Sequence, residues 1–191
     1  MQSPKTPLSA HWGEREGPIA ERWEGEVGKH SGIPRLTPTL STPEGGEGEE
    51  AGRVRLAVAA EAQSWLGTPF HHQGRVKGGG VDCAMLLAEI YYRCGLVPYV
   101  DPGYYPPDWH LHRDAERYLE KLMPYARELA GPPAPGDVAV FQFGRTFSHG
   151  AIVIDWPRLI HAYWQRGVVW GDATLNPLAG RKVRFFGVID V

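Results

Sequence analysis

The chain is organised around Gly78-Gly79-Gly80-Val81-Asp82-Cys83-Ala84-Met85-Leu86-Leu87-Ala88-Glu89-Ile90-Tyr91-Tyr92. Three consecutive glycines do not hold a helix, whereas the apolar run after them predicts a helix packed on several sides. Asp82 suits the N-cap of that helix. Cys83 then falls in the first turn, where unpaired backbone N–H groups and the helix dipole favour a thiolate. We expect any chemistry of this protein to begin there.

Composition divides the 191 residues into two parts. Residues 1–52 are rich in Gly, Pro, Ser, Thr and Glu, with 5 Lys/Arg against 9 Asp/Glu. Such a segment buries too little apolar surface to offset its ordering entropy, so we predict a disordered extension. Residues 53–191, with 15 Lys/Arg against 13 Asp/Glu, are predicted to form one globular domain with a real core.

Several protein classes are excluded by what the sequence lacks. It has no run of about 18 apolar residues, so we expect no membrane insertion. Its N-terminus has no apolar signal-peptide region, so no secretory signal is expected. Its 2 cysteines cannot form a disulfide scaffold, and neither part is basic enough to indicate nucleic acid as a partner.

The order of the expected elements indicates an α+β fold. Helices are predicted over about 53–66, 82–94 and 114–129, the third interrupted or bent by Pro124. Strand patterns begin after the Pro135-Gly136-Asp137 turn, at 138–141, 149–154, 159–164, 167–170 and 183–191. Helices followed by a meander predict an antiparallel sheet of about five strands, with the Cys-bearing helix packed on it.

Two histidines are candidates for the base that Cys83 needs as a nucleophile. His149 opens one predicted strand and His161 lies in the next. If the connecting hairpin has a three-residue loop, His161 faces Ala151, and both histidines lie on one sheet face as diagonal neighbours. An even-length loop would place them on opposite faces. A Cys–His–His triad therefore requires an odd loop or a β-bulge in this hairpin.

Five blocks, in order, resemble those of the NlpC family of bacterial cell-wall cysteine peptidases. They are Trp65-Leu66-Gly67-Thr68-Pro69-Phe70, Asp82-Cys83, Pro135-Gly136-Asp137-Val138, Ser148-His149-Gly150-Ala151-Ile152-Val153 and Ile160-His161-Ala162. The resemblance covers about residues 53–191. It is greatest to the branch encoded with tail genes of phages and gene transfer agents, through His71-His72-Gln73, Lys77-Gly78 and Tyr105 to Asp108-Trp109.

The resemblance implies a papain-like minimal core and a metal-independent, cofactor-free peptidase. Its substrate would be the stem peptides of peptidoglycan, cleaved after D-γ-glutamyl. By position, Cys83 is the nucleophile, His149 the base and later acid, and His161 the residue that orients His149. The matching blocks also supply the candidate substrate-binding residues, which are Phe70, His72, Asp82, Trp109 and Ser148.

The resemblance further implies a place at the tail tip of a phage-like particle, made in the bacterial cytoplasm and acting at the cell wall. Peptidoglycan and other tail proteins would then be the partners. Two departures from the family pattern keep rival functions open: Ala84-Met85 replaces the usual Ser-Gly, and Phe70 replaces the usual Tyr. The rivals are a tail structural or assembly protein with a vestigial site, and a thiol amidase or acyltransferase on the same fold.

Other motifs have simpler explanations. Cys94 lies too far along the helix from Cys83 for a disulfide and is assigned to the core. The glycine run lacks the Gly-Lys-Ser/Thr of a phosphate-binding loop. His110 and His112 lack further ligands at zinc-site spacing. The aromatic residues of the 97–112 loop either line a substrate groove or cap the core.

Overall fold

Helix α1 (Glu47–Ser64) opens the folded part of the chain. The computed structural model describes residues 46–106 and 116–188. The helix begins at Glu47, not near Arg53, so the predicted start of the first helix is wrong. Glu50 pairs with Arg53 one turn further along the helix, and its negative charge suits the positive end of the helix dipole. Residues 1–45, the rest of the predicted extension, lie outside the described residues.

Helix α2 (Cys83–Arg93) is the central helix, and Asp82 is its N-cap as predicted. Its buried residues are Met85, Leu86, Leu87, Glu89, Ile90 and Tyr91. It packs against α1 and against two strands of the main sheet, β5 (Thr146–Asp155) and β6 (Arg158–Tyr163). The predicted loop before it forms a small hairpin of β1 (Arg75–Val76) and β2 (Gly80–Val81). This hairpin leads the chain into the first turn of α2.

The third helix is shorter than predicted. Helix α3 spans Arg117–Leu122, and strand β3 (Ala126–Glu128) follows where the helix was expected to continue. Pro124 explains the break, because proline cannot donate the next helical hydrogen bond and disfavours helix at the residue before it. The N-terminal end of the expected helix, at residues 114 and 115, lies outside the described residues.

The main sheet is antiparallel, with six strands in the order β3-β8-β4-β5-β6-β7. Its other members are β4 (Val138–Phe143), β7 (Gly167–Asp172) and β8 (Val183–Val188). The predicted α+β class is confirmed. The sheet has one strand more than the five predicted, and that strand is β3. It pairs with β8 at the edge of the sheet.

The hairpin between β5 and β6 meets the register that the two histidines require. Ile152 pairs with Ile160, and the same register places Ala151 opposite His161. The turn contains Trp156 and Pro157, an even number of residues, but a β-bulge between Val153 and Asp155 restores the register. A bulge inserts one residue into one strand, which is the compensation that an even loop needs.

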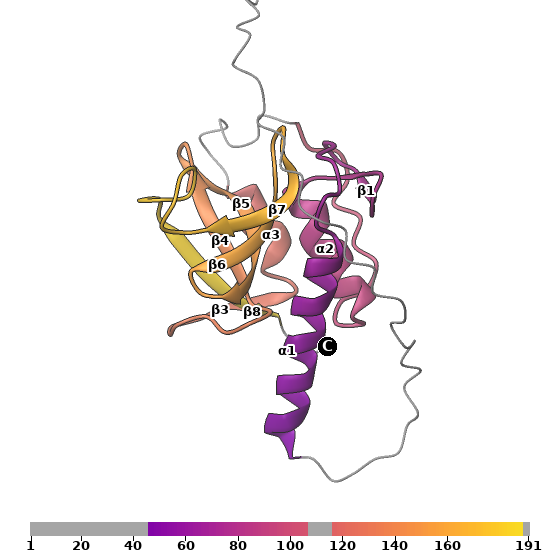
Figure 1. The fold of residues 1–191 in the computed structure, drawn as a ribbon, viewed down its shortest axis with the longest axis vertical. Coiled ribbons are helices and arrows are strands. Elements are labelled where there is room, and N and C mark those ends of the chain that lie inside the picture. Colours follow the sequence, from indigo (N-terminus) through magenta and orange to yellow (C-terminus); the bar gives the residue numbers. More distant parts are fainter. Residues whose placement is uncertain (1–45, 107–115, 189–191) are drawn as a thin grey trace, which may run out of the picture. The chain divides into compact units, whose positions relative to one another are not determined.

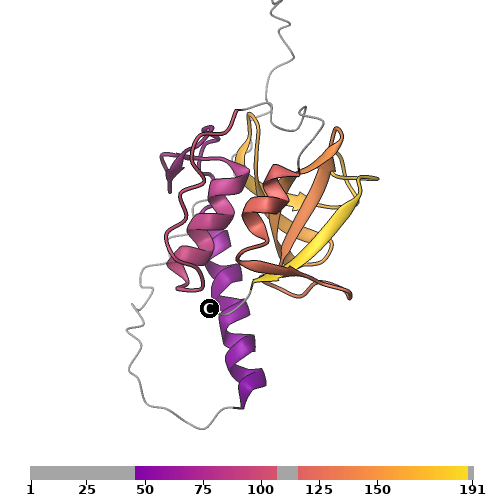
Figure 2. The same ribbon diagram turned by 180° about the vertical axis from the view of Figure 1, so that it is seen from behind.

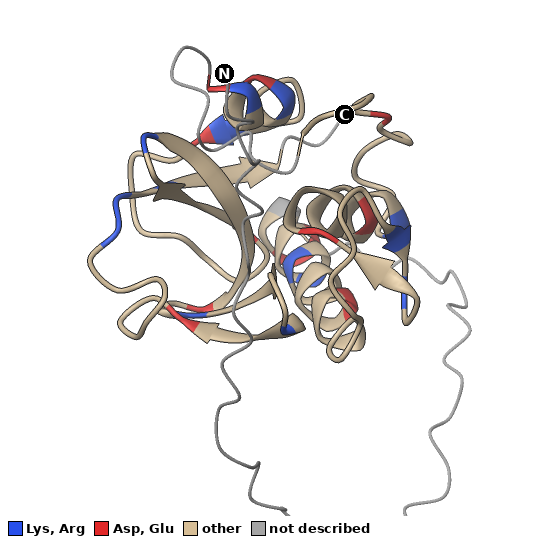
Figure 3. Ribbon diagram, turned by 90° about the horizontal axis from the view of Figure 1, so that it is seen from above, with Lys and Arg blue, Asp and Glu red and all other residues tan. Residues whose placement is uncertain are grey.

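Helices α1, α2 and α3 gather beside the curved sheet, with α2 and α3 lying together against it (Figures 1 and 2). Lys/Arg and Asp/Glu are interspersed along the helices (Figure 3). Arg55 of α1 is tied to the turn before β4, where its Nη1 donates to Asp137 at 2.6 Å. In the described part of the chain, no helix is long and apolar enough to cross a membrane.

The turn after α1 is bonded to β7, the strand at the opposite edge of the sheet from β3. The N–H of Gly67 donates to Val168 O at 2.9 Å, and the N–H of Val168 donates to Thr68 O at 2.8 Å. Gly167 allows the approach, because a Cβ there would lie 2.3 Å from Thr68 O. The Trp65-to-Phe70 block therefore lies along β7, next to the strand that carries His161.

Candidate active site

A histidine pair lies on neighbouring strands, on the face of the sheet that also carries Phe141 and Leu159, opposite the face that packs on α2. His149 Nε2 and His161 Nδ1 are 2.7 Å apart and share a hydrogen bond. Both side chains are buried. Tyr163 stacks on the His161 ring at 5.6 Å between ring centres, and Phe143 lies 4.9 Å from the His149 ring. Aromatic neighbours on both sides hold the two rings in one arrangement.

Cys83 lies against the backbone of β5 at His149. Its thiol donates to Ser148 O at an S···O distance of 3.9 Å, and the N–H of Gly150 also contacts the sulfur. These two peptide groups flank His149 in the chain. The ring nitrogen of His149 nearer to its own backbone is Nδ1, and the farther one, Nε2, is bonded to His161. Nδ1 is therefore the ring nitrogen that the bond to His161 does not use, while the thiol itself is bonded to the backbone on either side of His149.

The ionisation of the site differs from the expected thiolate–imidazolium pair. Burial and the neighbouring Asp82 carboxylate raise the pKa of the Cys83 thiol to about 12. Burial, and then the proximity of His161, lower the pKa of His149 well below its usual 6.5. Burial lowers the pKa of His161 to about 4. Since the helix N-terminus does not outweigh burial here, the resting site holds a neutral thiol beside two neutral imidazoles.

Asp82 is the most heavily bonded side chain near the thiol. Its Oδ1 accepts from the N–H groups of Ala84 and Met85, the cap of α2. Its Oδ2 accepts from the N–H of Gln73 at 2.7 Å and from the Tyr105 hydroxyl at 2.6 Å. With these donors around it, the buried carboxylate fixes the first turn of α2. This arrangement makes Asp82 a positioning residue for Cys83.

The other predicted substrate-binding residues lie in different surroundings. His72 bonds through Nε2 to the carbonyl of Tyr105 at 2.8 Å, and its Nδ1 lies 3.6 Å from Asp82 Oδ2. Phe70 packs edge-on against Trp164, with ring centres 5.4 Å apart. Ser148 is buried, and its hydroxyl donates to Thr146 O. Trp109 lies outside the described residues.

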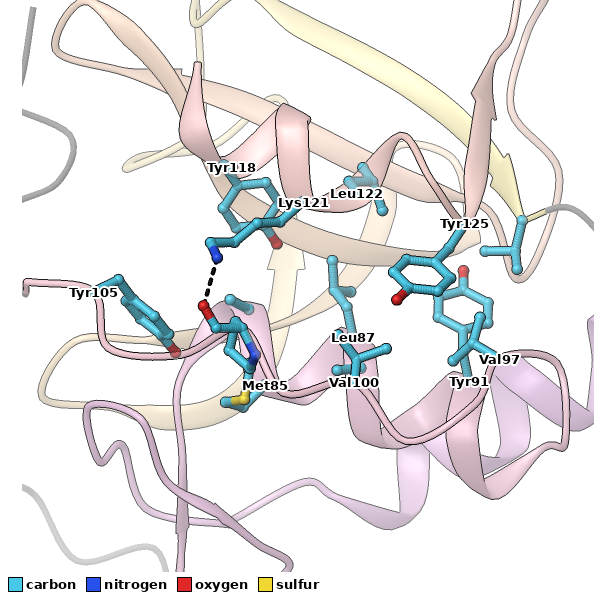
Figure 4. A pocket seen from close by; sticks show the side chains of 14 residues that line it. Met85, Leu87, Tyr91, Val97, Val100, Tyr105, Tyr118, Lys121, Leu122 and Tyr125 are labelled. Carbon is cyan, nitrogen blue, oxygen red and sulfur yellow. Dashed lines mark hydrogen bonds between the residues drawn. The ribbon is translucent and has the colours of Figure 1, made fainter. Parts of the chain in front are cut away.

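The Ala84-Met85 departure faces away from the sulfur. Both residues line a cavity of about 80 Å³ between α2, α3 and the chain around Val97 to Tyr105 (Figure 4). The remaining lining is largely apolar, with Lys121 donating to Pro102 O at its edge. Ala84 and Met85 thus add apolar packing on the side of α2 that lines the cavity, while the N–H of Ala84 still contacts the Cys83 sulfur.

Two glycines that were not predicted as site residues, Gly150 and Gly171, allow neighbouring side chains to pack closely on the strands around the histidine pair. A Cβ at Gly150 would lie 1.8 Å from the Tyr118 hydroxyl and 2.6 Å from Leu87 Cδ1. A Cβ at Gly171 would lie 3.0 Å from His161 Nε2. Gly150 directly follows His149, so its position in the motif was the available signal. Gly171 comes to His161 only through the pairing of β6 with β7, which the local pattern does not specify.

The described residues contain no group of three or more His, Cys, Asp or Glu side chains that could hold a metal ion. The site contains the three components that nucleophilic catalysis by a thiol requires: a thiol at the start of a helix, a candidate base and a partner that orients the base. The arrangement can therefore support attack by sulfur on a carbonyl carbon.

Comparisons with known proteins show the fold. The chain matches the peptidoglycan hydrolase RipB from Mycobacterium tuberculosis with a TM-score of 0.52 and 16% identity, over 80% of this chain and 74% of that chain. It matches NlpC2 from Trichomonas vaginalis with a TM-score of 0.51 and 16% identity, over 70% of this chain and 46% of that chain. No protein-family model and no curated protein matched the sequence. Through these likenesses, the helices and sheet that carry Cys83, His149 and His161 have the NlpC/p60 fold.

Proposed function

We propose that this protein is a cysteine endopeptidase that cleaves the stem peptides of peptidoglycan after D-γ-glutamyl. The observation that carries the proposal is the 2.7 Å bond between His149 Nε2 and His161 Nδ1, beside a thiol in the first turn of α2. The RipB structure, which shares the fold, is described as a peptidoglycan hydrolase. The resemblance to phage-type peptidases supports delivery at a tail tip, with peptidoglycan and other tail proteins as partners.

The proposed reaction begins with one proton transfer. With a proton on Nε2, His149 donates to His161 Nδ1 and leaves its own Nδ1 free to accept. Rotation of the Cys83 side chain moves the thiol from Ser148 O to this nitrogen. The sulfur then attacks the peptide carbonyl carbon as Nδ1 takes the proton. His161 stabilises the imidazolium through the existing bond.

In the later steps His149 gives this proton to the leaving amine and takes another from water. The oxyanion of the tetrahedral intermediate is stabilised by backbone N–H groups, among them that of Cys83. The His149 imidazolium protonates the leaving amine, which departs and leaves an acyl-enzyme on the sulfur. Water then attacks the thioester as His149 accepts its proton, and collapse releases the acid and restores the thiol.

Mass spectrometry of products from purified muropeptides tests the proposal. The parent protein should cleave, and the Cys83→Ala and His149→Ala variants should not. Cys94→Ser is the matched control, since it removes the other cysteine of the same region and should leave cleavage intact. Cleavage should also persist with a chelator present. Activity that survives in Cys83→Ala, or that the chelator abolishes, would contradict the mechanism.

A second candidate function is a tail structural or assembly protein with a vestigial site. The raised thiol pKa, about 12, favours it, because a neutral buried thiol is a weak nucleophile until its proton is removed. Under this function neither the parent nor Cys83→Ala would yield products, and particles carrying Cys83→Ala would assemble normally. Product formation by the parent would eliminate it.

A further inference from the structure

Arg181 presents a guanidinium that the fold holds in place on three sides. Its Cζ lies 3.7 Å from the centre of the Phe143 ring. Its Nε donates to Pro177 O at 2.6 Å, and its Nη1 donates to Gln142 O at 3.2 Å. These bonds leave Nη2 for another acceptor. Within residues 46–106 and 116–188, no acidic side chain forms an ion pair with Arg181.

This guanidinium lies close to the histidine pair. Phe143 is stacked under Arg181, and its ring centre is 4.9 Å from that of His149. The two distances limit the separation between the guanidinium carbon and the His149 ring centre to about 9 Å, within roughly one Debye length. The charge of Arg181 also contributes, after burial and His161, to the lowered pKa of His149. An ordered positive charge therefore adjoins the site where a carbonyl would be attacked.

We propose that Arg181 binds a free carboxylate of the substrate next to the cleaved carbonyl, and so makes the enzyme selective for anionic peptides. The inference rests on the proposed function. In a γ-linked glutamyl residue the α-carboxylate lies about 5 Å from the γ-carbonyl carbon along the extended side chain. With the sulfur attacking that carbon beside His149, the carboxylate comes within reach of the guanidinium.

The chemistry of the two groups matches. Guanidinium binds carboxylate through charge-assisted hydrogen bonds with a fixed fork geometry. Because stacking and two backbone carbonyls already order Arg181, little side-chain entropy remains to be lost on binding. An amide at the same position carries no charge, so substrate amidation would weaken the contact.

The alternative role for Arg181 is structural. Its bonds to Pro177 O and Gln142 O tie the chain before β8 to the end of β4. If this is its only role, removing the guanidinium affects every substrate alike. Selective binding instead predicts an effect that depends on the substrate charge.

The test compares two muropeptides that differ only in carrying a free D-glutamyl α-carboxylate or its amide. For each, kcat/KM is measured with the parent, Arg181→Gln and Arg181→Lys, and binding is measured by calorimetry in the Cys83→Ala background. The matched control is Arg158→Gln, since Arg158 is an exposed arginine stacked on Trp170 at 5.0 Å. Thermal unfolding establishes that each variant is folded.

We expect the parent to prefer the carboxylate substrate by about tenfold or more, the usual size of one charge-assisted hydrogen bond. Arg181→Gln should make the two substrates equivalent, Arg181→Lys should keep part of the preference, and Arg158→Gln should keep all of it. A parent without preference, or equal losses on both substrates in Arg181→Gln, would overturn the inference. Absence of cleavage by the parent would contradict the proposed function alone, because the binding preference in Cys83→Ala is measured independently.

Discussion

In the proposed mechanism His149 carries the proton-transfer chemistry, and the burial of its side chain determines the pH range over which it is neutral. Its pKa is lowered well below 6.5, and that of Cys83 is raised to about 12. Over the intervening pH range both groups are neutral, and a thiol–imidazole pair of this kind reacts by base catalysis during attack. If the proposed reaction takes place, its pH profile therefore reports how deeply Cys83 and His149 are buried.

The first prediction concerns that profile. Activity should fall with decreasing pH only below 6.5, as His149 becomes protonated, and should not decline at the ordinary thiol pKa of 9.0. The measurement is kcat/KM against pH with one muropeptide. A decline centred near pH 9 would contradict the neutral pair, because it would indicate that a thiolate–imidazolium pair is the active form.

Asp82 has two effects on Cys83: its negative charge raises the thiol pKa, and its side chain caps the helix on which Cys83 lies. The Asp82→Asn variant removes the first effect and keeps the second. Asparagine retains an oxygen acceptor for the N–H groups of Ala84 and Met85, so α2 should keep its N-cap. Loss of the negative charge removes the second-largest cause of the raised thiol pKa, so the pKa should fall. The rate of Cys83 alkylation by iodoacetamide against pH measures it.

Asp137→Asn is the control for this second prediction. It neutralises another buried carboxylate, paired with Arg55 at the turn before β4, and should leave the Cys83 alkylation profile unchanged. Equal changes in both variants would show that general destabilisation exposes the thiol. Only a change confined to Asp82→Asn supports a local electrostatic effect.

At the scale of elements, Gly150 sets how closely β5 approaches α2 and α3. Gly150→Ala should destabilise the protein by about 1–3 kcal/mol, the usual cost of overpacking, since its Cβ would overlap the Tyr118 hydroxyl and Leu87. Adding Tyr118→Phe removes the nearest atom and should restore part of the loss. Urea unfolding of the single and double variants provides the free energies.

Gly52→Ala in α1 provides the comparison, because no atom lies within 4 Å of the added Cβ. That change should leave stability equal or raise it by about 0.5–1 kcal/mol, the difference in helix propensity. If Gly150→Ala were equally harmless, the close approach of the strand to the helices would be absent in solution. Retained stability would also weaken the proposed position of the Cys83 sulfur.

At the scale of the whole molecule, the Arg55–Asp137 pair links α1 to the sheet. Asp137 is buried, whereas the Arg55 side chain is 40% exposed. Arg55→Met should cost about 2 kcal/mol of unfolding free energy, below the loss for a fully buried pair, because solvent can partly compensate Asp137. Arg53→Met, which removes an exposed pair with Glu50, should change stability by less than about 0.5 kcal/mol. Equal effects in urea unfolding would contradict the linking role.

Local sequence was sufficient for many elements. The glycine run, Asp82 and the apolar residues after it predicted α2 and its N-cap, because capping and helical packing act over neighbouring residues. The local pattern did not predict the short segments whose conformation depends on pairing with a distant strand. The chain after Pro124 forms β3, and this strand exists through its pairing with β8, a long-range contact.

The sequence by itself determined the α+β class, the residues of the candidate triad and the condition that the β5–β6 hairpin must satisfy. Only the tertiary structure decided how that condition is met, through a bulge between Val153 and Asp155 that turns His161 toward His149. It also decided the ionisation of the Cys83 thiol at the start of α2. Local geometry there favours a thiolate, but burial against β5 and the Asp82 carboxylate keep it protonated, because desolvation arises only when distant segments pack together.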